Sequence, residues 1–135
     1  MIETIEELIR FIETDDSELN ESSSWEEAPE ILWHELLLKY CDDPDMRFAV
    51  TLNKTLPTSV LMVLAKDDSW RVRCTVAKKR RLEPSIRELL SKDENEAVRR
   101  GIAYNQKTPR EILAKMVNDP VPDIAERVRK RLAES

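Results

Sequence analysis

A repeat of 26 residues runs through most of the chain and restricts the fold more than any other feature of the sequence. Apolar, acidic and basic residues each recur at this spacing. The sets are Val50, Val76, Ile102 and Val128; Met46, Val72, Val98 and Ile124; Val60, Ile86 and Ile112; Leu64, Leu90 and Met116; Asp67, Asp93 and Asp119; and Arg47, Arg73 and Arg99. Because periods of about 20–50 residues are typical of stacked structural units, this spacing predicts a repeat protein.

Each repeat predicts two short helices. In the first helix, apolar residues such as Val72 and Val76 lie four apart, which is the spacing of one helical face. The second helix is expected to begin at a proline, because the first helical position needs no N–H donor; these prolines are Pro57, Pro84 and Pro109. Side-chain caps are expected from Thr108 with Glu111 and from Ser85 with Glu88. Asp67, Asp93 and Asp119 are expected either to cap the helix of the next repeat or to favour its N-terminal dipole.

These patterns predict an all-α protein that forms a single domain over residues 1–135. The predicted α-solenoid has about three and a half two-helix repeats of 26 residues, with an N-terminal capping helix. Its parts are an acidic cap helix and loop (1–28), a half repeat (29–41), three repeats (42–67, 68–93 and 94–119) and a C-terminal cap (120–135). Gly101, the only glycine, shares a repeat position with Ala49 and Thr75, which predicts close approach of neighbouring helices despite the poor helix propensity of glycine.

The N-terminal third departs from the repeat. Residues 2–13 predict an amphipathic helix whose apolar stripe consists of Ile5, Leu8, Ile9 and Ile12. Residues 15–28 predict an acidic loop. The helix that follows is expected to match the second helix of a repeat, with Leu37 and Leu38 lying 26 residues before Val63 and Leu64.

The third repeat, "VRRGIAYNQKTPREILAKMVND", resembles the leucine-rich repeat variant family, a group of HEAT-like α-solenoids. The matching positions are Val98, Arg99, Ile102, Ala103, Asn105, Thr108, Pro109, Ile112, Leu113 and Asp119. The resemblance covers about residues 42–132 and implies a right-handed superhelix of short helices. It implies little about function, because repeat folds are mostly binding scaffolds. One architecture in this family adds an N-terminal cysteine cluster for an iron–sulfur centre, but this chain has only Cys41 near that end, so no cofactor is implied.

The sequence offers few groups for catalysis or metal binding. His34, the only histidine, aligns with the core positions Val60 and Ile86, and one glycine cannot build a phosphate-binding loop. Two cysteines and one histidine make a poor zinc site, so we expect no enzyme activity, no metal and no cofactor. Cys41 and Cys74 are expected to be buried thiols, which indicates a reducing, cytoplasmic location. No apolar run is long enough to span a membrane.

The two parts of the chain carry opposite charge. Residues 1–45 have 15 acidic and two basic side chains, a net charge of −13, whereas residues 46–135 have 20 basic and 12 acidic side chains, a net charge of +8. Acidic groups around aromatic anchors suit a basic protein partner. The first interpretation is therefore a protein-binding module, by analogy a cognate inhibitor or immunity-type protein against a basic toxin or nuclease. Its expected contacts lie in the acidic region and on the adjoining concave face: Asp15, Asp16, Glu18, Glu21, Trp25, Glu26, Glu27, Glu30, Trp33, Asp42, Asp43 and Trp70.

Nucleic-acid binding is the alternative interpretation. The arginines that recur with the repeat would form a ladder along one face, extended by the cationic run at residues 78–81, and would neutralise phosphates. The residues are Arg47, Arg73, Lys78, Lys79, Arg80, Arg81 and Arg99. In the same run, Lys79 replaces the asparagine that the other copies have as Asn53 and Asn105. A third interpretation is an adapter in a larger assembly, and apart from its partner the chain is expected to be a monomer.

Overall fold

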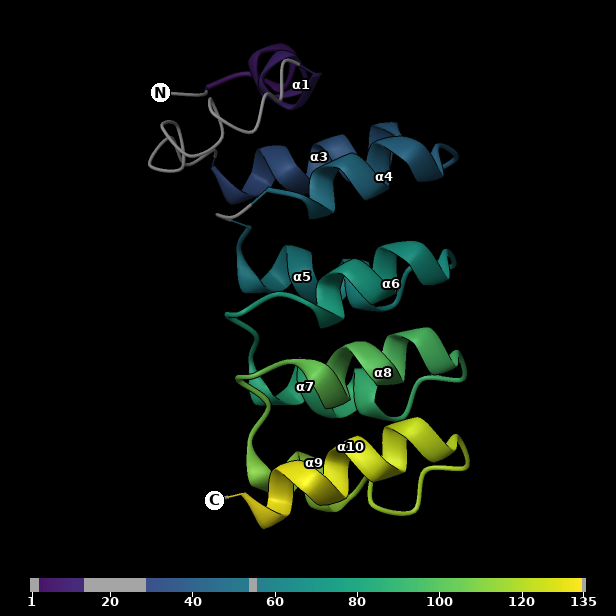
Figure 1. Cartoon of the computed structure of the whole chain (residues 1–135). Helices are drawn as coiled ribbons and strands as arrows, with labels where there is room; N and C mark the ends of the chain where they lie inside the picture. The colour runs from purple at the N-terminus through teal and green to yellow at the C-terminus, as the bar shows by residue number, and fades with distance from the viewer. Residues whose placement is uncertain (1–2, 14–28, 54–55, 135) are drawn as a thin grey trace. The chain divides into compact units, whose positions relative to one another are not determined.

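The computed structural model describes residues 3–13, 29–53 and 56–134, with backbone only for residues 11–13 (Figure 1). These residues are α-helical or lie in the connections between helices, so the expectation of an all-α protein is confirmed for this part of the chain. Contacts divide the chain into two compact units, Met1–Leu64 and Ala65–Ser135, which are considered separately below. Within the described residues, no helix is both long enough and apolar enough to cross a membrane.

The first unit contains the helices α1 (Ile5–Glu13), α3 (Glu30–Lys39), α4 (Pro44–Thr51) and α5 (Thr58–Ala65, whose last residue belongs to the second unit). Helix α1 packs on α3. Its Leu8 is fully buried and its Ile5 is partly buried, as the apolar stripe predicts. Residues 15–28, the segment expected to be an acidic loop, lie outside the described part of the chain.

The predicted register of α3 is wrong by two residues. The buried positions of α3 are Leu32, Trp33, Leu36 and Leu37, and those of α5 are Val60, Leu61, Leu64 and Ala65. The two sets are 28 residues apart rather than 26. Helix α3 continues for two residues beyond its last buried position, whereas α5 ends at its last buried position. As a result Leu38, which was expected in the core, is among the most exposed apolar residues.

The second unit contains α6 (Trp70–Ala77), α7 (Pro84–Ser91), α8 (Glu96–Tyr104), α9 (Arg110–Ala114) and α10 (Pro122–Ala133). Helix α8 packs on both α6 and α10, so these three helices form one layer. Helices α7 and α9 contact each other and form the second layer, which lies behind the first in Figure 1. The chain therefore alternates between the two layers as it passes from α6 to α10.

The apolar residues that recur with the repeat form the core. The series that contains Val50 and the series that contains Val60 are buried in every copy, as is the series that contains Leu64. In the remaining series, Val72, Val98 and Ile124 are fully buried but Met46 is only partly buried. Burial of these residues from water provides the main stabilisation of each helix pair.

The helix starts differ in detail from the prediction. Pro84 is the first residue of α7, as expected, but Pro57 precedes α5 and Pro109 is the N-cap residue of α9. The expected capping box of Thr108 with Glu111 does not form, because Pro109 is the N-cap residue of α9 and Thr108 precedes it; the Thr108 hydroxyl donates to the Ile102 carbonyl at 2.7 Å. Ser85 cannot cap α7 because it lies inside that helix, after Pro84.

Asp67, Asp93 and Asp119 do not cap the following helices directly. Each carboxylate accepts a hydrogen bond from the backbone N–H two residues later, at 2.9 Å in all three cases. These contacts fix the turn that precedes the helix. The N-cap position itself is occupied by Ser69 and by Asn95 before α6 and α8.

A second recurring contact ties the ends of neighbouring helices together. The Asn105 side-chain amide donates to the carbonyls of Ala77 at 2.9 Å and Lys79 at 2.7 Å, at the end of α6. One repeat later, Arg131 donates to the equivalent carbonyls of Ala103 at 2.8 Å and Asn105 at 2.7 Å. These bonds satisfy carbonyl groups that a helix terminus leaves without partners. They also show that α6 and α8 end side by side and hence run in the same direction.

Candidate binding groove and its surroundings

A groove of about 810 Å³ lies between α6 and α8 in the second unit. Small residues line it, namely Cys74 on α6 and Ala97 and Gly101 on α8. Gly101 is small for a steric reason, since a Cβ atom at this position would lie 3.0 Å from the Cβ of Ala77. The predicted close approach of helices at Gly101 is therefore present. One repeat later Arg127 takes the position of Gly101, and its guanidinium lies 5.1 Å from the ring centroid of Tyr104.

The groove has an aromatic side chain at each end. Trp70 is the first residue of α6, Tyr104 is the last residue of α8, and each is 45% exposed. Because the two helices run in the same direction, these two residues are offset along the helix axes by about one helix length, roughly 12 Å for eight residues. One arginine lies over each ring: Arg71 at 5.8 Å from the centroid of Trp70, and Arg127 over Tyr104. Such a contact is a weak cation–π attraction that steadies the orientation of the ring.

Cationic side chains line the groove at the end where α6 and α8 finish. Lys78, Arg80 and Lys107 belong to the turns that follow these helices and are exposed. None of the three makes an ion pair or side-chain hydrogen bond with another described residue. No acidic side chain is among the lining residues. The field in this end of the groove is therefore positive and favours an anionic ligand.

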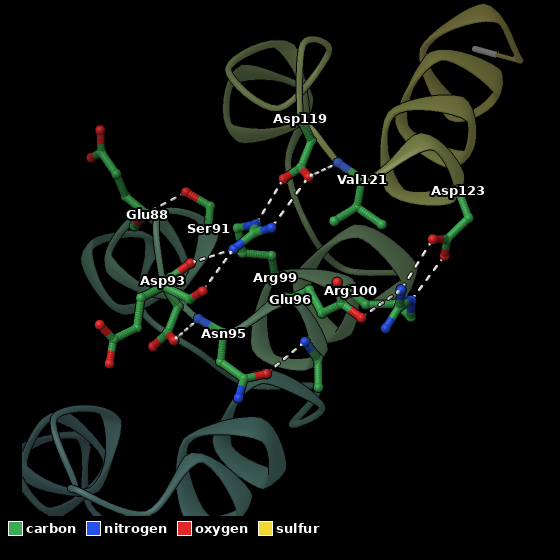
Figure 2. Close-up of polar contacts among 12 residues, drawn as sticks. Glu88, Ser91, Asp93, Asn95, Glu96, Arg99, Arg100, Asp119, Val121 and Asp123 are labelled. Carbon is green, nitrogen blue, oxygen red and sulfur yellow. Dashed lines mark hydrogen bonds and ion pairs between the residues drawn. The ribbon is translucent and has the colours of Figure 1, made fainter.

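Arg100 also lines the groove, but its charge is already paired. Its guanidinium donates to both carboxylate oxygens of Asp123 on α10, at 2.8 Å and 3.0 Å, as Figure 2 shows. Glu96 approaches it from one turn earlier, at 3.8 Å. The hydrogen bond from Arg100 lowers the pKa of the Asp123 carboxyl, and the same bond raises the pKa of Arg100. The ligand-accessible charge of the groove consequently rests on Lys78, Arg80 and Lys107.

A buried arginine shapes the cationic turn. Arg87 on α7 donates to the carbonyls of Arg80 at 2.9 Å and Leu82 at 3.3 Å, and it is only 4% exposed. Burial lowers the pKa of its guanidinium. The equivalent residues in the neighbouring repeats are Leu61 and Leu113, both buried. Arg87 therefore replaces a core leucine with a group that can hold the turn after α6 in one conformation.

The arginines expected to form a phosphate-binding ladder are engaged with the protein itself. Arg73 donates to the carboxylate of Asp93 at 2.8 Å and 3.2 Å. Arg99 donates to that of Asp119 at 2.8 Å and 3.4 Å, as Figure 2 shows. Their side chains are only 12% and 14% exposed. Each also donates to the backbone carbonyl that precedes its own helix, from Asp67 or Asp93. The series therefore has a structural role, which leaves little of these two guanidinium groups available to phosphate.

The other residues predicted to bind nucleic acid do not share one location in the structure. Arg47 in the first unit donates to the Cys41 carbonyl at 2.7 Å. Burial lowers the pKa of Lys79 to about 8. Arg81 is exposed but does not line the groove. Of the seven predicted positions, only Lys78 and Arg80 line the groove.

The predicted acidic surface is only partly described. Residues 15, 16, 18, 21 and 25–27 lie outside the described residues. Glu30, Asp42 and Asp43 are exposed, and Asp43 caps α4 by accepting from the backbone N–H groups of Asp45 and Met46. Trp33 was expected to be a surface contact, but it is 1% exposed because it faces the core of the first unit. Trp70 is exposed, but it belongs to the cationic groove.

No cluster of side chains suited to a metal ion occurs among the described residues. His34 is partly exposed and its Nε2 lies 3.0 Å from the hydroxyl of Ser59, which donates to Glu30. Cys74 is buried as expected, whereas Cys41 is exposed, since it lies in the turn after α3.

Sequence patterns alone missed Arg87, which donates to the carbonyls of the turn beside the groove. Arg87 was hidden because it occupies an apolar position of the repeat. Trp70 and Tyr104 are 34 residues apart, and their common location depends on the packing of α6 against α8. One sequence feature that indicated the groove was the glycine at position 101, since the last copy of the repeat has Arg127 at the equivalent position.

Comparisons with protein-family models, with curated proteins and with solved structures found no match. The resemblance to leucine-rich repeat variant proteins therefore stays a prediction.

Proposed function

We propose that the chain is a short right-handed α-solenoid of about three and a half repeats with an N-terminal capping helix, related to leucine-rich repeat variant proteins. The recurring packing of α8 on α6 and of α10 on α8 supports this architecture. The repeated Arg–Asp pairs and the contacts of Asn105 and Arg131 support it as well. In this proposal the protein is a non-catalytic binding module, as expected of a repeat scaffold.

The proposed working surface is the groove between α6 and α8, and its ligand is a negatively charged macromolecule. The observation that carries this proposal is the combination, in one groove, of two exposed aromatic rings with three cations that have no ion pair among the described residues, and no acidic residue among the described lining. The second unit as a whole supports the same sign of ligand, because residues 65–135 contain 18 Lys and Arg against 12 Asp and Glu, a net charge of +6.

The second candidate is the inhibitor or immunity-type function, in which the acidic N-terminal region binds a basic toxin or nuclease. The exposure of Glu30, Asp42 and Asp43 favours it. Burial of Trp33 removes one of its expected aromatic contacts. A reducing, cytoplasmic location remains part of either proposal, because Cys41 and Cys74 are both free thiols.

Affinity capture from a cell lysate with matched variants separates the two candidates. Arg80→Glu with Lys107→Glu reverses the charge of the groove, whereas Arg81→Glu with Lys130→Glu changes two exposed cations that do not line it. Glu30→Lys with Asp42→Lys alters the acidic surface. We expect the captured partner to be lost only with the groove variant. Loss only with the acidic-surface variant would favour the inhibitor function instead.

A further inference from the structure

We propose that the groove between α6 and α8 binds single-stranded nucleic acid, with bases stacked on Trp70 and Tyr104 and phosphates held by Lys78, Arg80 and Lys107. This inference rests on the proposed function, which assigns an anionic ligand to the same groove, and it specifies the chemical class of that ligand.

The lining of the groove favours bases over an amphipathic peptide. Peptide helices generally dock through aliphatic side chains into a groove lined by other large apolar residues. No Leu, Ile, Val or Met is among the described residues that line the groove, and its large apolar surfaces are the rings of Trp70 and Tyr104. Stacking is the interaction that such isolated rings offer, and every nucleobase has a face that can accept it.

The exposure and fixed orientation of the two rings favour stacking with a base. Each ring is about half exposed and carries a guanidinium group over it, from Arg71 or Arg127. The arginine contact holds the ring in place, so less conformational entropy is lost when a base packs on the exposed part. Asn105, which also lines the groove, is fixed by its bonds to the end of α6 and keeps the two helices at a constant spacing.

The charges are arranged for a backbone that passes the end of the groove. Lys78 directly follows α6, Arg80 belongs to the turn that Arg87 holds, and Lys107 follows α8. Three cations close to one aromatic ring match the alternation of phosphate and base along a strand. A duplex fits less well, because its bases are stacked on one another and cannot reach the two rings.

Fluorescence anisotropy with the full chain tests the inference with three labelled probes: a single-stranded oligothymidylate of about 12 nucleotides, a duplex of the same length, and an oligoglutamate peptide. We expect the single strand to bind most tightly. Its affinity should fall with salt, with a slope of about −2 in log K against log salt for three phosphate contacts. Arg80→Glu should weaken binding and make this slope shallower, whereas Arg81→Glu, its exposed neighbour outside the groove, should change neither by much.

Matched ring variants separate stacking from general apolar contact. Trp70→Leu and Tyr104→Leu should each weaken binding of the single strand by about 5-fold or more, whereas Trp70→Phe should retain most of the affinity. Both rings are partly exposed, so these variants should fold, which equal thermal unfolding midpoints would verify.

Three results would overturn the inference. One is binding of the duplex as tightly as the single strand with no effect of Trp70→Leu. Another is binding of oligoglutamate but not of oligothymidylate, with loss in Arg80→Glu, which would leave the groove as an anion-binding surface for an acidic protein. The third is that wild-type protein binds none of the probes, in which case the proposed groove function fails together with this inference.

Discussion

The guanidinium group of Arg99 and the carboxylate of Asp119 face each other across the start of a repeat, with contacts of 2.8 Å and 3.4 Å. The pair of Arg73 and Asp93 repeats this geometry 26 residues earlier. Each aspartate also accepts from a backbone N–H two residues later, and each arginine donates to a backbone carbonyl before its own helix. The pairs therefore connect the turns of successive repeats and have a structural role.

Removal of one partner from such a pair should be costly. Asp119→Ala should lower the free energy of unfolding by about 3–5 kcal/mol, because it leaves the mostly buried Arg99 guanidinium without its counter-charge. Urea unfolding followed by circular dichroism measures the change. Asp123→Ala is the matched control. The pair of Asp123 with Arg100 is more exposed, so its loss should lower the free energy of unfolding far less. Equal effects of the two substitutions would contradict the structural role.

Arg87 should control the order of the turn after α6. Arg87→Leu restores the apolar residue of the neighbouring repeats but leaves the carbonyls of Arg80 and Leu82 without their donor. We expect faster trypsin cleavage within residues 78–81. The free energy of unfolding should fall by about 1–3 kcal/mol, partly offset by the added apolar burial. Limited proteolysis with mass spectrometry locates the cleavage. If cleavage there is no faster than in wild type, Arg87 does not hold the turn.

The close approach at Gly101 should appear as coupling with Ala77. Gly101→Ala gains about 1 kcal/mol of helix propensity, but its Cβ would lie 3.0 Å from the Cβ of Ala77, and overpacking costs about 1–3 kcal/mol. We expect net destabilisation. Ala77→Gly should remove the clash, so the double variant should be more stable than the sum of the single changes predicts. A double-mutant cycle of unfolding free energies measures this coupling, and additive effects would exclude it.

Lys79 should make stability depend on pH. Burial lowers its pKa from 10.5 to about 8, so folding disfavours the charged amine. Below pH 8 both states are protonated and the full penalty applies; between about pH 8 and 10.5 the unfolded chain holds more protons, so stability rises with pH. Lys79→Asn, which restores the asparagine of the other copies, should therefore stabilise the protein at pH 7 by about 1–2 kcal/mol, a figure reduced for partial exposure.

The pH profile distinguishes this effect from a general change in the turn. The advantage of Lys79→Asn over wild type should shrink as the pH rises from 8 toward 10.5. An advantage of Lys79→Asn that stays constant over this range would mean that the titration of Lys79 is not its source.

Much of the fold could be predicted because the repeat places the same kind of residue at the same structural position. Val76 and Ile102 are both fully buried, as their shared series required. The prediction failed at Leu38, where two extra helical residues shift the register of α3 relative to the period. It also failed at Thr108, because α9 begins one residue later than expected, so Pro109 rather than Thr108 occupies the N-cap position.

The candidate site was less predictable than the fold. The cationic run at residues 78–81 was visible, but only two of its members, Lys78 and Arg80, line the groove. The recurring arginines were predicted to bind phosphate because a sequence shows their formal charge. It does not show that aspartates of the recurring series neutralise that charge. Arg73 and Asp93 are 20 residues apart, and only the packed structure shows that they pair.

The sequence by itself determined the helical class, the approximate positions of the helices in the second unit and the apolar residues of its core, because hydrophobic periodicity and burial depend on local spacing. Tertiary structure decided which charges are paired and which remain available to a ligand. It also decided that Trp70 and Tyr104 share one groove, because the absence of a Cβ atom at Gly101 lets α8 approach α6 closely. The physical reason is that electrostatic pairing and groove shape depend on distances between helices, which the order of residues along one helix does not specify.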